Sequence, residues 1–229
     1  MPFENSTIFN PSSSSSLGTF YKFGSGTSFS LYVRGTRGQI YGVARQVNDL
    51  GTIFSLSPSR KLTTLHRFNG VDGSYPNSLI RDRANNLYGL TEKGGANNGG
   101  TVFKLSANGV LTTLYNFEEG NHATSLIRDS SNNLYGSLFD GSGVQSIFQI
   151  ATDGTFTSLY TLDKKDKPSS ISFAYKGALY GTFPAYGFPP YDCFDLNKKQ
   201  CGGIFKLRIS STAPVRRHSP LSMLQAPNE

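Results

Sequence analysis

Charged residues are scarce in this sequence. Lys, Arg, Asp and Glu make up 16% of its 229 residues, whereas an average globular domain contains about a quarter. Long apolar runs are also missing, since none approaches the roughly 18 residues that a membrane-spanning helix needs. Apolar residues do not recur at the helical period of about 3.6 residues either. The sequence therefore predicts neither a transmembrane segment nor long helices.

Cysteine and histidine are few, with two Cys and three His. The histidines His66, His122 and His218 are far apart in the sequence, and none lies near a cysteine, so the ligand set of a zinc site is not present. The chain also contains no Gly-x-Ser-x-Gly elbow, P-loop or His-Glu-x-x-His motif. We therefore expect no metal, no cofactor and no enzymatic activity.

The 22 basic residues outnumber the 15 acidic ones and give the chain a net charge of +7. They are spread along the sequence, whereas a nucleic-acid-binding face bunches them with aromatic residues. We interpret the charge as diffuse and expect no nucleic-acid partner. Residues 1–16 contain neither the basic region nor the apolar region of a signal peptide. The sequence therefore predicts no export signal in this chain.

Gly, Ser, Thr and Asn are abundant, together with 12 Tyr and 17 Phe. This composition favours many short strands joined by tight turns. Two turn pairs, Asn108-Gly109 and Asp153-Gly154, lie between strand-like runs. They predict hairpin turns, because both central residues of such a pair can adopt positive φ.

Four Tyr-Gly pairs recur at regular intervals, with spacings of 47, 47 and 45 residues between successive Tyr. Each pair follows a strand-like run and precedes an Ile/Val-Phe strand, and the first three copies continue into a fourth strand. One copy is therefore a four-stranded antiparallel meander, and such units in tandem predict an all-β fold of propeller blades. The pairs are Tyr41-Gly42, Tyr88-Gly89, Tyr135-Gly136 and Tyr180-Gly181, and the strands that follow carry Phe54, Phe103, Phe148 and Phe205.

The predicted repeat domain covers residues 6–209 and has about four blades. It begins with two strands of a partial copy and ends inside the last copy. A ring could therefore be closed by Leu17–Phe23 completing the sheet of residues 170–208, which would remove exposed sheet edges. The count of 17 strands exceeds the 16 of four blades, so an open or incomplete array stays an alternative. The predicted segments are an extension 1–5, the partial copy 6–23, copies 28–68, 77–117, 124–162 and 169–208, and a disordered tail 210–229.

The second copy carries a family resemblance. Its Asn-Leu-Tyr-Gly, its glycine-rich stretch 94–100 and its strands Thr101–Leu105 and Leu111–Phe117 resemble the Gloeo/Verruco (GloVer) tandem repeat of certain bacterial proteins. The match covers most of residues 6–208. The resemblance implies a surface or secreted, propeller-like repeat protein of unknown biochemical role. This chain has few repeats and no visible anchoring signal.

The repeated residues have two interpretations. The four Tyr could line a channel and stack on sugars, or they could be scaffold residues whose rings pack between blades while the Gly lets backbones approach. A residue that every copy needs favours the scaffold interpretation. Arg81-Asp82 and Arg128-Asp129 could likewise hold a ligand, but hydrogen bonds between blades or within turns are expected. His66 replaces the Tyr of other copies and is interpreted as a packing residue.

An insertion from Phe183 to Gln200 breaks the regularity of the last copy. Loops of this kind often carry function, and its exposed aromatic and acidic residues suit sugar stacking or protein contact, although they could simply cover a blade edge. The two cysteines flank this loop and predict a disulfide if the protein is extracellular, or two free thiols if it is cytosolic. The candidate ligand-binding residues are Tyr186, Phe188, Tyr191, Asp192 and Asp195, and the candidate disulfide joins Cys193 and Cys201.

The sequence thus favours a non-enzymatic repeat scaffold that binds a glycan or a protein through loops on one face. A monomer is expected, and an extracellular or cell-surface location follows from the repeat resemblance and the cysteine pair. Two alternatives stay open. One is a propeller-type hydrolase or lyase with acidic residues at the central mouth, and the other is a truncated repeat array without activity of its own.

Overall fold

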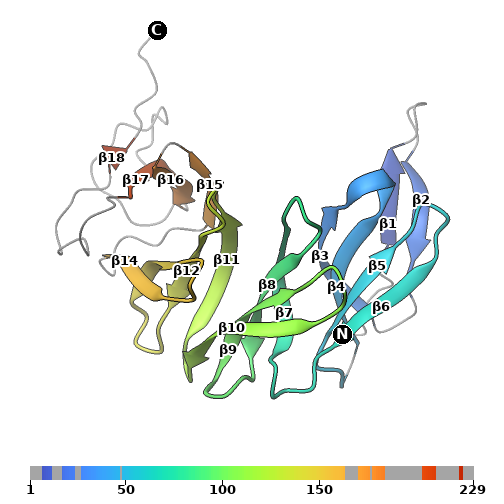
Figure 1. Cartoon of the computed structure of the whole chain (residues 1–229), viewed down its shortest axis with the longest axis horizontal. Helices are drawn as coiled ribbons and strands as arrows, with labels where there is room; N and C mark the ends of the chain where they lie inside the picture. Colours follow the sequence, from blue (N-terminus) through green and yellow to red (C-terminus); the bar gives the residue numbers. More distant parts are fainter. Residues whose placement is uncertain are drawn as a thin grey trace, which may run out of the picture. The chain divides into compact units, whose positions relative to one another are not determined.

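The computed structural model of the protein describes residues 7–11, 17–23, 27–46, 48–162, 170–175, 177–183, 203–209 and 222–223. This part of the chain is built of short antiparallel strands with a single 3₁₀ turn, Thr36–Gly38 (Figure 1). No helix in it is long or apolar enough to cross a membrane. The all-β prediction is confirmed. The chain folds as two compact units, Met1–Glu118 and Glu119–Glu229, which are described separately.

The first unit contains a two-stranded sheet followed by two four-stranded sheets, each with its strands in simple up-and-down order. Every hairpin pairs consecutive strands, so the four-stranded meander predicted from the Tyr-Gly repeat is confirmed. The strands are β1 (Thr7–Pro11) and β2 (Leu17–Lys22); β3 (Thr27–Arg34), β4 (Ile40–Gln46), β5 (Thr52–Leu56) and β6 (Leu62–Arg67); and β7 (Ser74–Arg81), β8 (Leu87–Lys93), β9 (Asn98–Leu105) and β10 (Leu111–Glu118).

The second unit contains two further four-stranded antiparallel sheets. In both units the first strand of a sheet packs against the first strand of the sheet before it, since β7 contacts β3 and β15 contacts β11. The strands are β11 (His122–Arg128), β12 (Leu134–Phe139), β13 (Gln145–Ile150) and β14 (Phe156–Leu162); and β15 (Ser170–Tyr175), β16 (Ala178–Phe183), β17 (Gly203–Arg208) and β18 (Ser222–Met223).

The hairpin loops share one geometry. In the loop Ser106–Val110 the Gly109 N–H donates to the Ser106 carbonyl at 2.9 Å, and the Ser106 N–H donates to the Val110 carbonyl. Gly109 has a φ of 87°, whereas Asn108 is not among the residues with positive φ. This pattern is a type I turn followed by one left-handed residue, so the expectation of positive φ at both central residues is wrong. The same bonds occur in loops 57–61, 82–86, 129–133, 140–144 and 151–155.

Each repeat is held together by a glycine that faces a phenylalanine. Register places Gly42 opposite Phe54, Gly89 opposite Phe103, Gly136 opposite Phe148 and Gly181 opposite Phe205. All four Phe rings are buried. A Cβ on Gly89 or on Gly136 would lie 2.3 Å from the Cζ of the opposing ring. The repeat thus keeps a glycine because the neighbouring ring occupies the space of its missing side chain.

The sheets of the first unit are joined by an aromatic contact that occurs twice. Phe68, which follows β6, meets Phe103 edge to face with 5.3 Å between ring centroids. Phe23, which follows β2, meets Phe54 in the same way at 5.3 Å. The pair β1–β2 therefore makes the same aromatic contact with the sheet β3–β6 as the pair β5–β6 makes with the sheet β7–β10. This agrees with a partial copy at the start of the array that supplies a third and a fourth strand.

The sheet order places β18 beside β17 in the last sheet, where Leu17–Phe23 was expected. β2 pairs with β1, and Phe23 is buried against Phe54 of the sheet that follows it. Closure of the array into a ring stays a prediction. Ser222–Met223 lie within the segment expected to be a disordered tail, and the expectation differs from the structure at these two residues.

Candidate functional site

The candidate residues of the last repeat lie outside the described residues. This applies to the ligand-binding candidates Tyr186, Phe188, Tyr191, Asp192 and Asp195 and to the cysteines Cys193 and Cys201. Their roles stay predictions. The remaining sequence candidates, which are the Tyr-Gly pairs, the Arg-Asp pairs and His66, are described in the structure.

Where they can be followed, the repeated tyrosines bind the turns that precede them. The Tyr88 hydroxyl donates to Asp82 at 3.3 Å and the Tyr135 hydroxyl donates to Asp129 at 3.0 Å. Tyr41 instead donates to the Gln39 side chain at 3.1 Å. Tyr135 also accepts a hydrogen bond from Gln149 Nε2 of the neighbouring strand β13 at 3.1 Å. In these three copies the tyrosine therefore has a structural role, as the scaffold interpretation expects.

The paired arginines have structural contacts too. Arg81 donates through Nε to the Arg34 carbonyl of the preceding sheet at 3.0 Å and through its guanidinium to Asn85 at 2.6 Å. Arg128 donates to Asn132 in the corresponding turn. The first contact joins two blades and the others brace a turn, as the sequence suggested for these residues.

Tyr135 makes the scaffold sensitive to alkaline pH. Burial, together with its bond to Asp129, raises the pKa of Tyr135 from 10.0 to about 12. The folded chain therefore keeps a proton that the unfolded chain loses above pH 10, so stability is unaffected below pH 10 and falls as the pH rises toward 12. We expect a loss of about 1.4 kcal/mol by pH 11. Urea denaturation at pH 8 and 11 should show this loss in the wild type but not in Tyr135→Phe. Equal losses in both proteins would contradict it.

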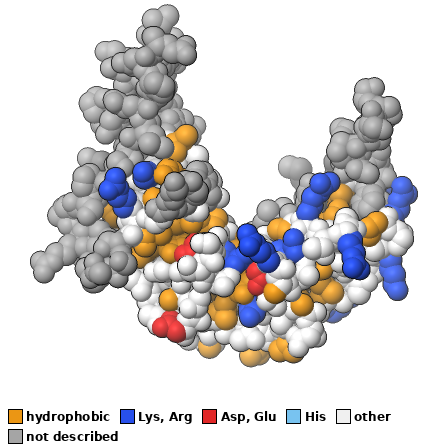
Figure 2. Space-filling model, turned by 45° about the horizontal axis from the view of Figure 1, so that its top comes forward, with side chains coloured by type: hydrophobic (Ala, Val, Ile, Leu, Met, Phe, Trp, Pro, Cys, Tyr) orange, Lys and Arg blue, Asp and Glu red, His pale blue; other side chains and the backbone are white. Residues whose placement is uncertain are grey.

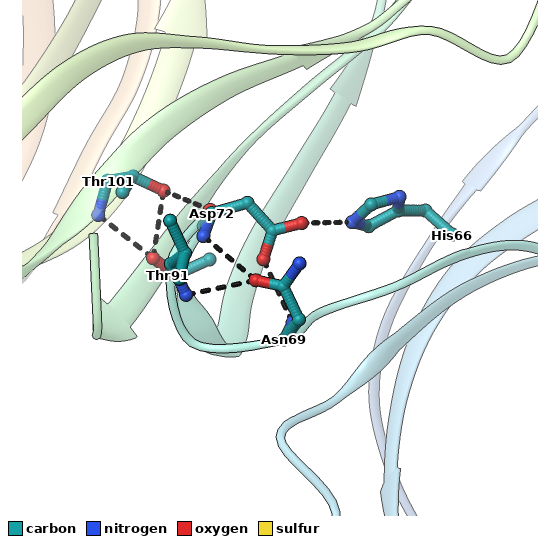
Figure 3. Close-up of polar contacts among 6 residues, drawn as sticks. His66, Asn69, Asp72, Thr91 and Thr101 are labelled. Atoms are coloured by element: carbon teal, nitrogen blue, oxygen red, sulfur yellow. Dashed lines mark hydrogen bonds and ion pairs between the residues drawn. The ribbon is translucent and has the colours of Figure 1, made fainter. Parts of the chain in front are cut away.

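The loop between β6 and β7 carries a hydrogen-bond network (Figure 3). His66 Nε2 lies 2.7 Å from Asp72 Oδ2, and the Asn69 N–H donates to the other carboxylate oxygen at 2.9 Å. Asn69 in turn accepts the N–H groups of Val71 and Asp72. These hydrogen bonds thus hold the Asp72 carboxylate in place and, at the same time, order the backbone of the loop.

Two buried threonines connect this loop to the end of β8. The Thr101 hydroxyl donates to the Asp72 carbonyl at 3.3 Å, the Thr101 N–H donates to the Thr91 hydroxyl oxygen at 2.9 Å, and the Thr91 hydroxyl donates to the Lys93 carbonyl at 3.3 Å. Thr91 and Thr101 are fully buried. A satisfied buried network of this kind rigidifies its surroundings. It therefore holds the backbone at Asp72 and at Lys93 in a fixed relation.

His66 is the one described imidazole that a carboxylate orients. Its ring packs edge to face on Phe68 at 5.0 Å, which agrees with the packing role inferred from the sequence, but its bond to Asp72 was not foreseen. Among the described residues no hydroxyl or second carboxylate contacts its other ring nitrogen, and no three His, Cys, Asp or Glu side chains gather as metal ligands. The pair positions a base, while the described residues supply no nucleophile beside it.

Tyr75 stands next to this network in an unusual backbone conformation. It is the second residue of β7 and has a φ of 58°. Such a conformation costs a non-glycine residue of the order of 1–3 kcal/mol and persists only where the surroundings enforce it. Here the Tyr75 N–H donates to the Leu50 carbonyl at 2.6 Å, and Pro76 is wedged against Gly51. Backbone outliers of this kind concentrate at functional sites.

Two cations converge on the Tyr75 ring. The Arg45 guanidinium carbon lies 4.7 Å from the ring centroid and Lys93 Nζ lies 5.9 Å from it. β4 ends beside Arg45, β7 begins beside Tyr75 and β8 ends on Lys93, so three strand ends of the first unit supply this cluster. We call Arg45, Tyr75 and Lys93 the cation cluster. On the face drawn in Figure 2, Lys and Arg cover more of the surface than Asp and Glu.

The cation cluster is specific to one place in the array. At the spacing of the Tyr-Gly pairs, Ser28 and His122 occupy the position of Tyr75, and Gln46 and Asp140 occupy that of Lys93. Sequence reasoning missed these residues because none belongs to a motif and β4 precedes the others by some thirty residues. Aligning the copies position by position, rather than by their shared residues alone, would have marked Tyr75 and Lys93 as deviations.

The fold has clear relatives among solved structures, at low sequence identity. A catalytically inactive virginiamycin B lyase from Staphylococcus aureus with quinupristin gives a TM-score of 0.61 at 12% identity, covering 98% of this chain and 61% of that one. A luciferin-regenerating enzyme gives 0.52 at 17%, covering 79% and 61%. The extracellular domain of a hybrid two-component system from B. thetaiotaomicron gives 0.55 at 15%, covering 91% and 23%.

The chain spans 55–61% of the length of the lyase and of the luciferin-regenerating enzyme. The tandem four-stranded sheets and these neighbours define a propeller-like repeat protein. More narrowly, the chain belongs to the Gloeobacter/Verrucomicrobia repeat family, whose repeat matches residues 2–190. This confirms the resemblance seen in the second copy. No curated protein matches the sequence.

Proposed function

We propose that this chain is a non-enzymatic repeat scaffold that binds a glycan or a protein through the loops at the end of β4, β6 and β8. The observation that carries the proposal is the strained Tyr75, which presents its ring between two cations at that end. The Gly–Phe pairs repeat because they build the sheets, whereas the cation cluster serves no repeated structural need. A strained backbone conformation such as that of Tyr75, which serves no repeated structural role, supports a role in ligand binding.

The neighbouring network supports binding by a rigid surface. The chain from Asp72 through Thr101 and Thr91 to Lys93 fixes two of the loop segments before any ligand arrives. A surface that is already ordered loses little conformational entropy on binding, which favours affinity. A monomeric, extracellular protein, expected from the repeat resemblance and the cysteine pair, remains part of the proposal. Catalysis, the alternative, would have to use the His66–Asp72 pair with groups outside the described residues.

The test is a glycan microarray and a panel of purified extracellular proteins probed with the wild type and with Tyr75→Asn. Asn tolerates the left-handed conformation, so this change removes the ring and keeps the backbone. We expect the wild type to bind at least one probe and Tyr75→Asn to bind it about tenfold more weakly, as for an aromatic residue at the centre of an interface.

Val110→Ser is the matched control for this test. Val110 is 58% exposed and lies in the loop between β9 and β10, at the end of the sheet opposite Tyr75. Its replacement should leave binding unchanged, and both variants should melt within a few degrees of the wild type. Absence of binding to every probe, or equal binding by Tyr75→Asn, would overturn the proposal.

A further inference from the structure

We infer that the ligand of the cation cluster is an acidic polysaccharide, whose carboxylate or sulfate groups are bound by Arg45 and Lys93. The inference rests on the proposed function and names the chemical class of ligand that the same site would take. Its basis is the balance of charge around the Tyr75 ring.

Arg45 and Lys93 face one ring without a counter-charge. The Arg45 guanidinium carbon lies 4.7 Å and Lys93 Nζ lies 5.9 Å from the Tyr75 centroid. Among the described residues, no carboxylate comes within 4.0 Å of either side chain. The ring quadrupole attracts both cations but carries no net charge. An acidic group bound to either cation would supply the missing counter-charge.

The nearby acidic groups are engaged or directed elsewhere. Asp72 is bonded to His66 at 2.7 Å, and Asp49 lies 4.0 Å from Arg67. Glu92 precedes Lys93 in β8, and because side chains alternate along a strand it belongs to the other face of the sheet. The positive charge of the cluster is therefore available to a ligand.

The number of charges favours a polysaccharide over a nucleic acid. A nucleic-acid groove needs a row of cations that follows successive phosphates, whereas this cluster holds two beside one ring. An aromatic ring with two cations beside it matches a sugar that carries an acidic group.

The experiment measures binding of four probes by isothermal titration calorimetry: polygalacturonate for carboxylates, heparin for sulfates, dextran as a neutral polysaccharide and oligo(dT) as a nucleic acid. Proteins are the wild type, Arg45→Gln, Lys93→Gln and the control Lys61→Gln. Lys61 is exposed in the turn before β6, at the opposite end of the sheet, and its replacement changes the net charge equally. Both cluster variants remove the charge and keep a polar side chain.

We expect binding to polygalacturonate or heparin and none to dextran. Loss of a charge-assisted bond should weaken binding about tenfold in Arg45→Gln and in Lys93→Gln, with no change in Lys61→Gln. Binding should also weaken as salt is raised, because these charges are exposed. The stronger of the two acidic probes identifies the acidic group.

The failures are distinguishable. Preference for dextran, or Arg45→Gln and Lys93→Gln that bind as the wild type does, would overturn the acidic ligand while leaving binding through Tyr75 intact. Preference for oligo(dT) would replace the polysaccharide by a nucleic acid. If no probe binds and Tyr75→Asn also has no effect on the wider panel, the inference and the proposed function fall together.

Discussion

Gly136→Ala should destabilise the second unit by about 3 kcal/mol, a large effect for the addition of a single methyl group. The new Cβ would lie 2.3 Å from Phe148 Cζ and 2.6 Å from the Ser125 carbonyl oxygen. Neither neighbour can yield easily, because the Phe148 ring is fully buried and Ser125 belongs to the paired strand β11. Urea denaturation at pH 7 measures the change in unfolding free energy.

Gly141→Ala is the control for this change. A Cβ at Gly141 would meet its nearest neighbour, the Gly120 Cα, at 3.6 Å, which is an ordinary contact, and its φ is not positive. We expect an effect within about 0.5 kcal/mol, since the new methyl group fits and also restricts the unfolded chain. Equal costs for the two substitutions would show that glycine is kept at position 136 for some reason other than the ring.

A double-mutant cycle separates the two contacts of the new methyl group. In a Phe148→Leu background the ring is gone while the Ser125 carbonyl remains, so Gly136→Ala should cost less there but still be unfavourable. The Phe148→Leu change itself should be destabilising, because the ring is fully buried. An unchanged cost of Gly136→Ala in this background would assign the whole effect to the backbone contact.

The scaffold was predictable from the sequence because it is periodic. Gly136 lies opposite Phe148, and the other three Gly-Phe pairs are arranged in the same way. Residues that recur at a regular spacing in four copies can be recognised in the sequence before their contacts are known. The turns were placed correctly at Asn108-Gly109, but their type was not. Asn108 and Gly109 can both adopt a positive φ, but in the loop Ser106–Val110 only Gly109 does so. A positive φ at that position is what a G1-type bulge requires.

The cation cluster could not be predicted in the same way, because it depends on packing between sheets. Arg45 meets Tyr75 only because β7 packs against β4. Tyr75 takes its position from a backbone conformation that its own sequence disfavours and that Leu50 and Pro76 enforce. The burial of Phe23 on Phe54 is likewise a contact between sheets that strand counting does not reveal.

Asp82→Ala should cost about 3 kcal/mol, because the buried Asp82 carboxylate accepts three hydrogen bonds inside its turn. The Asn86 N–H donates at 2.8 Å, the Asn86 side-chain amide at 2.7 Å and the Tyr88 hydroxyl at 3.3 Å. Burial alone would raise the pKa of Asp82, but these bonds outweigh it and the pKa is lowered. The stabilisation is therefore present at neutral pH and is lost as the pH falls through the lowered value.

Two further variants separate charge from position. Asp153→Ala removes an exposed turn carboxylate that accepts the Thr155 N–H at 2.9 Å, and should cost below about 1 kcal/mol. Asp82→Asn keeps an oxygen acceptor without the charge and should fall between the two alanine variants. Its stability should also depend less on acid pH than that of the wild type. A wild-type-like acid dependence in Asp82→Asn would show that other carboxylates govern acid unfolding.

Comparison with the first copy explains why no other group should replace the Asp82 carboxylate in its turn. There Gly35 stands at the position of Asp82, and Tyr41 donates to Gln39 instead. That copy therefore supplies its acceptor from the other end of the turn. The corresponding residue of the second copy, Asn86, donates its amide to Asp82 and accepts the Ala107 N–H at 3.1 Å. Asp82→Ala thus removes an acceptor for which the second copy has no substitute. Adding Asn86→Gln to Asp82→Ala should recover part of the lost stability by recreating the arrangement of the first copy.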